Sequence, residues 1–183
     1  VLINSAIAPT FVTEYQYDTW GRIREMGYPD GEIVTYDYDP AGNLYSVKGN
    51  KGGEEYTYLT SRGYDKFEEV VYMGFGNGAY SEYGFDQSRR WMNTIRTVMS
   101  DGVVVQDNLI EYDAIGNVLG ITNTAEAIPD RLGGPSEHRY SYDKLYRLTS
   151  AEGSWTGSDK SSTYSLTMEY DDLHNITFKD QAV

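Results

Sequence analysis

Bulky and polar side chains alternate in short stretches of the chain, and one such stretch returns at intervals. The pattern aromatic-x-aromatic-Asp occurs as YQYD (15–18), YDYD (36–39), YGFD (83–86) and YSYD (140–143), with looser copies IEYD (110–113), MEYD (168–171) and YTYL (56–59). The fourth positions of successive copies are 21, 20, 27, 27, 30 and 28 residues apart. This spacing is typical of one supersecondary unit repeated along a chain.

The alternation predicts a β-strand in each copy. Successive side chains of a strand point to opposite faces, so the two bulky residues of a copy share one face. The residue between them is polar or small in every copy, as in Gln16, Asp37 and Ser141. We therefore expect a sheet with one aromatic face and one solvated face.

The end of each copy predicts a turn. Asp can accept hydrogen bonds from the turn backbone, and a Gly three residues later tolerates positive φ. Five residues after the fourth position an apolar or aromatic residue starts the returning strand. The residues that we assign to this structural repeat are Tyr15, Tyr17, Asp18, Gly21, Tyr36, Tyr38, Asp39, Gly42, Tyr83, Phe85, Asp86, Tyr112, Asp113, Gly116, Tyr140, Tyr142, Asp143, Tyr170 and Asp171.

The opposite ends of the hairpins are marked by PDG (29–31), GNG (76–78) and SDG (100–102), which are tight-turn sequences. The predicted fold is all-β, an antiparallel meander of about a dozen strands. Residues 88–100 also fit a helical spacing, but their β-branched residues and the repeat register favour a strand. Residues 120–138 and 152–162 predict longer loops or extended hairpin tips.

Composition narrows the possible partners. The net charge of −13 argues against binding to nucleic acid or to an anionic membrane, because both need a basic surface. The absence of cysteine excludes disulfides and thiolate metal sites. No run of apolar residues is long enough to span a bilayer.

Candidate catalytic groups are poorly supported by the sequence. The aspartates recur once per hairpin at turn positions, whereas a catalytic carboxylate pair forms one constellation in one cleft. The two histidines, His138 and His174, stand beside a Gly-Pro loop and in a turn slot. We predict no enzymatic activity, and we assign no catalytic, cofactor-binding or metal-binding residue.

Five segments, YQYDTWGRI, YDYDPAGNL, EYDAIGNV, YSYDKLYRLTS and EYDDLHNI, resemble the YD repeats of Rhs proteins, of insecticidal toxin-complex components and of teneurins. The resemblance covers residues 14–178. It implies an open curved sheet of hairpins within a larger β-spiral or shell, in a secreted or cell-surface bacterial protein. It also implies a structural, non-catalytic segment of a shell that encloses or presents a C-terminal toxin, and the remainder of its own polypeptide as partner.

Residues 1–183 are then a single repeat segment, with units starting near 15, 36, 56, 83, 110, 140 and 168, and a fragment of a larger chain. Two alternatives remain: a carbohydrate- or protein-binding module that uses the Tyr-rich face or the 120–138 loop, and a glycosidase fragment with an unidentified acid pair. Unpaired edge strands are expected near Thr13–Asp18 and Leu166–Asp171, and such edges favour self-association.

Overall fold

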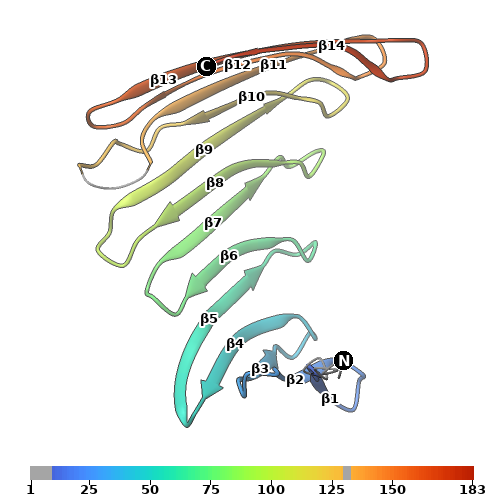
Figure 1. Ribbon diagram of the computed structural model, residues 1–183. Helices are drawn as coiled ribbons and strands as arrows, with labels where there is room; N and C mark the ends of the chain where they lie inside the picture. The colour runs from blue at the N-terminus through green and yellow to red at the C-terminus, as the bar shows by residue number, and fades with distance from the viewer. Residues whose placement is uncertain (1–9, 130–132) are drawn as a thin grey trace, which may run out of the picture.

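A computed structural model describes residues 10–129 and 133–183, and every regular element within these ranges is a β-strand (Figure 1). The strands are β1 (Glu14–Tyr17), β2 (Ile23–Gly27), β3 (Ile33–Tyr38), β4 (Leu44–Lys51), β5 (Glu54–Tyr64), β6 (Val70–Phe75), β7 (Tyr80–Phe85), β8 (Met92–Val98), β9 (Val104–Tyr112), β10 (Val118–Asn123), β11 (Ser136–Tyr142), β12 (Leu148–Thr156), β13 (Ser161–Tyr170) and β14 (Ile176–Ala182). No helix in the described part of the chain is long and apolar enough to cross a bilayer.

All 14 strands form one open sheet in the order in which they occur along the chain. Each strand pairs antiparallel with the next. Short turns connect most of these pairs in the manner of hairpins, and the longer connection 124–135 lies between β10 and β11. Figure 1 shows the strip turning gradually from β1 at one end to β13 and β14 at the other. The predicted all-β meander is confirmed.

The described residues form a single layer, so the sheet has little interior. Its buried apolar side chains are few and mostly small: Val34, Leu59, Ala79, Val98, Ala125 and Ala151. Most other strand residues are half-buried by their neighbours within the sheet. Cross-strand pairs, and not a second layer, therefore supply most of the packing.

The ambiguous segments can now be placed. Residues 88–100 contain β8, so the strand interpretation is confirmed. Residues 152–162 lie mainly in β12 and β13, which extend one hairpin tip as predicted. The ends of 120–138 belong to β10 and β11, and residues 130–132 lie outside the described part.

One predicted edge is wrong. β1 stands at one end of the sheet as expected, but residues 166–170 belong to β13, which pairs on both sides. The other edge is β14, whose seven residues are all exposed. The error arose because the apolar Ile176, five residues after Asp171, starts a further returning strand.

Candidate functional site: the aspartate turns

Seven turns along one edge of the sheet share a hydrogen-bonding scheme built on an aspartate. In the Asp143 turn, Oδ1 accepts the N–H of Leu145 at 2.8 Å and the N–H of Arg147 at 3.0 Å, while Oδ2 accepts Nε of Arg147 at 2.6 Å. One carboxylate thus closes the turn at three points. The seven aspartates are Asp18, Asp39, Asp65, Asp86, Asp113, Asp143 and Asp171.

The fourth residue after the aspartate usually completes the scheme with its own side chain. An Arg or Asn at this position donates to Oδ2 of the aspartate in the same turn. The five pairs are Arg22–Asp18, Asn43–Asp39, Asn117–Asp113, Arg147–Asp143 and Asn175–Asp171. The backbone N–H of Arg147, more than any other group, holds the pKa of Asp143 below its usual range. The side chain of Asn175 has the largest such effect on the pKa of Asp171.

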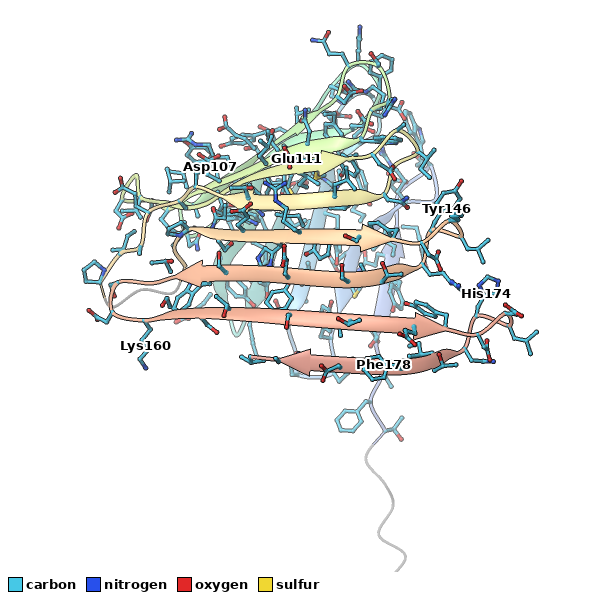
Figure 2. The ribbon with its side chains drawn as sticks, turned by 90° about the horizontal axis from the view of Figure 1, so that it is seen from above. Asp107, Glu111, Tyr146, Lys160, His174 and Phe178 are labelled. Carbon is cyan, nitrogen blue, oxygen red and sulfur yellow. The ribbon has the colours of Figure 1, made fainter. Side chains whose placement is uncertain are left out.

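In most of these turns, the third residue after the aspartate has positive φ. Gly fills this slot at Gly21, Gly42 and Gly116, with φ of 76°, 95° and 103°. Tyr146 and His174 occupy the same slot in two other turns, with φ of 63° and 67°. Figure 2 places both residues at the same side of the sheet, and Lys160, at a hairpin tip, at the opposite side.

The aromatic residue just before the aspartate reaches the neighbouring hairpin. The hydroxyl of Tyr142 donates to the carbonyl of Val118 at 2.9 Å, and Val118 is the first residue of the strand that leaves the preceding aspartate turn. We call this contact the inter-hairpin tyrosine bond. It recurs as Tyr38–Ile23, Tyr64–Leu44, Tyr112–Met92, Tyr142–Val118 and Tyr170–Leu148, with distances of 2.6–2.9 Å.

A β-bulge follows every aspartate turn. The returning strand carries one residue more than the strand it pairs with, as where Ser141 pairs with Ser150 and Tyr142 with Leu148, which leaves Thr149 unpaired. A bulge increases local twist and bends the strand. The bulge lies opposite the residue that precedes the aspartate, as at Tyr142.

The structure also places other polar groups that the sequence raised as candidates for chemistry. His138 lies beside Ser136 in sequence, but its Nδ1 is 3.1 Å from the Tyr164 hydroxyl on β13. Within residues 10–129 and 133–183, no group of three or more His, Asp or Glu side chains could hold a metal ion. The contacts along the turn edge can fix strands relative to one another. The aspartate carboxylates there accept hydrogen bonds from their own turns.

Comparisons with known proteins agree with this geometry. The RHS Repeat family model matches residues 17–54. The toxin subunits YenC1 and YenC2 of Yersinia entomophaga are 36% identical over 152 aligned residues and 32% identical over 166 aligned residues. The two alignments cover 78% and 82% of this chain. This chain belongs to the Rhs/YD-repeat family.

Several solved structures share the fold. A crystal structure of TcdB2-TccC3 superposes with a TM-score of 0.86 at 28% identity and covers 96% of this chain. A Photorhabdus luminescens Tc holotoxin pore matches 94% of the chain with a TM-score of 0.84, also at 28% identity. The chain spans 16% of the length of each Yersinia relative and 9% of each solved chain.

The third RHS repeat is not where the sequence pattern put it. Leu59, taken as the fourth position of the YTYL copy, lies in the middle of β5, and the turn is at Asp65. The expectation failed because alternating tyrosines in a long strand resemble the end of a repeat. The dipeptide Tyr64-Asp65, followed five residues later by the apolar Val70, is the signal that could have found it.

The Asp86 repeat contains one additional residue. The N–H of Asp86 donates to the carbonyl of Trp91, five residues later, whereas the other aspartates reach the fourth residue. Arg90 therefore occupies the positive-φ slot with φ of 60°, and Trp91 stands where five other turns have Arg or Asn. The slot that Gly21 fills in the first turn therefore lies one residue later in the Asp86 turn.

Where an RHS repeat begins with an aromatic residue, that residue lies within a strand of the sheet, two positions before the residue that precedes the aspartate. Tyr36 is paired opposite Val47, and Tyr140 opposite the buried Ala151. Tyr83 donates a weak hydrogen bond to the sulfur of Met73 at 3.6 Å. Tyr15, on the terminal strand β1, is 48% exposed because the described sheet has no strand beyond it.

Proposed function

We propose that this chain is a non-catalytic wall segment of the RHS-repeat shell of a secreted bacterial toxin-complex subunit. The observation that carries the proposal is the one-layer sheet of 14 strands, in which the inter-hairpin tyrosine bond recurs along the turn edge. A curved single layer has no interior in which to build an active site, but it separates two volumes. The two Yersinia relatives that are similar in sequence are toxin subunits.

The partner that fits best is the remainder of the same polypeptide. The strands at the two ends of the described sheet, β1 and β14, have main-chain groups on their outer sides that a further strand can pair with. The turn edge adds exposed apolar side chains directly after several aspartates: Trp20, Phe67, Ile115, Leu145 and Leu173, which are 54–81% exposed. Other repeats of a larger shell would cover both features, and the 183 residues act as one unit within it.

Protease protection tests the wall function. In the complete toxin subunit we expect the C-terminal region to resist a protease, and we expect the double variant D143A/D171A to expose it, because two neighbouring turns lose their carboxylates. The matched control is Asp159→Ala, at the opposite edge of the sheet. Equal digestion of the C-terminal region in the native protein and the double variant would contradict the proposal.

A second candidate function is carbohydrate binding by the tyrosine-rich surface. Tyr56 and Tyr58 are 37% and 47% exposed, their rings meet edge to face at 5.2 Å, and both hydroxyls donate to Glu32. Aromatic rings beside a carboxylate are able to stack on and hydrogen-bond a sugar. Calorimetric titration with neutral oligosaccharides tests this, and loss of the binding heat in Tyr58→Ala is the expected result.

A further inference from the structure

The junction between β6 and β7 departs from the repeat rule in three ways. At this position the residue before the aspartate is Phe85, which has no hydroxyl to donate, whereas the other five junctions carry the inter-hairpin tyrosine bond. The ladder between the two strands is short, pairing Tyr72 with Glu82, Met73 with Ser81 and Gly74 with Tyr80. The β2–β3 ladder is equally short but has its tyrosine bond.

The second departure is an acidic residue in the slot that should donate. In the Asp65 turn the fourth residue is Glu69, where five other turns have an Arg or Asn that donates to its own aspartate. Two carboxylates therefore face each other with no donor side chain from their own turn. A pair of like charges at partly buried positions is unfavourable unless a cation lies beside it.

The third departure supplies that cation from across the junction. The additional residue in the Asp86 turn projects Arg90 toward the preceding turn, and its Nη2 forms ion pairs with both Asp65 and Glu69. The guanidinium carbon lies 4.4 Å from the ring centre of Phe67 and 5.5 Å from that of Phe85, so one ring from each turn flanks it. Its Nε is buried without a hydrogen-bond partner in the described structure.

We propose that Arg90 is an ionic latch that replaces the tyrosine bond at the β6–β7 junction. We propose further that the sheet opens first at this junction when the carboxylates paired with Arg90 lose their charge. The three departures occur together at this one junction. Phe85 provides a ring for the cation, Glu69 provides a second anion, and the extra residue brings Arg90 within reach.

The latch divides the strip into two blocks, β1–β6 and β7–β14, that are internally joined by tyrosine bonds. Opening is confined to the aspartate-turn edge, because the Gly76–Gly78 tip keeps β6 and β7 connected through the hydrogen bond from the N–H of Phe75 to the carbonyl of Ala79. The stack of Tyr72 on Tyr80 at 5.8 Å lies within the ladder. The junction therefore behaves as a hinge with a closed end and an ionic end.

Acid is the condition that selects this junction. Burial acts to raise the pKa of Asp65, but the N–H groups of Phe67 and Glu69, together with Arg90, outweigh it and hold that pKa below its usual value. The latch is therefore intact above the ordinary Asp pKa and is lost as pH falls through the lowered value. Phenol groups do not change charge in this range. The other charged groups at the junction are Lys66 and Glu68 beside the carboxylates, and Asp86 and Arg89 beside Arg90.

Amide hydrogen exchange read by mass spectrometry tests the latch in the complete chain. We expect Arg90→Gln to accelerate amide exchange in β6 and β7 about tenfold. A tenfold change is the effect expected from the loss of about one charge-assisted hydrogen bond. We expect F85Y/R90Q to restore protection, because it places a hydroxyl directly before the aspartate, where the other five junctions have their donor. The matched control is Arg147→Gln, which removes an equivalent arginine from a turn whose junction keeps the Tyr170 bond.

Each result bears on the proposal. Acceleration confined to β6 and β7, rescue by F85Y/R90Q and a smaller effect of Arg147→Gln on β12 and β13 would support it. Unchanged exchange in Arg90→Gln, or equal opening of both junctions, would overturn it. If Arg90→Gln does not fold, Phe85→Tyr alone decides: it should slow exchange at the junction and reduce its acceleration on going from neutral to acidic pH, and no change in either would reject the latch.

Discussion

Removal of one hydroxyl tests whether the inter-hairpin tyrosine bonds hold neighbouring hairpins together. Tyr142→Phe deletes the donor to the carbonyl of Val118, 2.9 Å away, and keeps the aromatic ring. Since the ring still fills the same space, the change isolates one hydrogen bond. A hydrogen bond contributes about 0.5–1.5 kcal/mol net, so we expect the free energy of unfolding to fall by about 1 kcal/mol.

Urea unfolding followed by far-ultraviolet circular dichroism measures this loss. The midpoint should fall while the dependence of the unfolding free energy on urea stays unchanged, because the same surface becomes exposed. The control is Tyr146→Phe, which removes a hydroxyl from a ring that is 61% exposed at the same edge. If both variants lose the same stability, the tyrosine bonds contribute nothing specific to the sheet.

Three further perturbations address the turn itself. Asp39→Asn should lower the urea midpoint less than Asp143→Asn. The Oδ2 atom of Asp39 is 3.5 Å from the Asn43 amide, whereas that of Asp143 is 2.6 Å from Nε of Arg147. The reverse order of midpoints would contradict the hydrogen-bonding scheme. Tyr146→Gly should stabilise by about 0.5–1 kcal/mol by relieving a positive φ, and a lower thermal midpoint would refute this. The lowered pKa of Asp143 contributes stability above the ordinary Asp pKa that is lost as pH falls through the lowered value, so acid unfolding monitored by circular dichroism should shift to higher pH in Asp143→Ala.

The predictable part of this molecule is what one repeat contains by itself. The alternation in YDYD and the Asp-x-x-Gly spacing follow from the geometry of one strand and one turn, so the hairpins and the role of Asp39 were accessible from sequence. The partner strand is also local, because each strand pairs with its chain neighbour. For this reason the order of all 14 strands required no long-range information.

What failed depended on features that one repeat does not show. The long β5 carries several alternating tyrosines, so the true turn at Asp65 was hidden by a better-looking copy at 56–59. The additional residue before Trp91 changes which backbone atoms bond, and no change in composition marks it. The tyrosine bonds also join residues 15–24 positions apart, beyond any periodicity within a hairpin.

A single-layer sheet must find its apolar cover within the sheet, and the glycines of the strand interiors show how. Gly49 pairs directly with Tyr56, and Gly153 with Tyr164. A Cβ on Gly49 would lie 2.5 Å from the Tyr56 ring, and one on Gly153 would lie 2.6 Å from the Tyr164 ring. Each ring therefore lies flat over the opposing backbone in space that only glycine leaves free. The numerous tyrosines thus have two roles in the sheet. Within a ladder, their rings provide the packing that a second layer would otherwise supply. At the turn edge, their hydroxyls bond one hairpin to the next. A single-layer sheet of this kind can lengthen by adding repeats without needing a larger core, which a conventional sandwich cannot do.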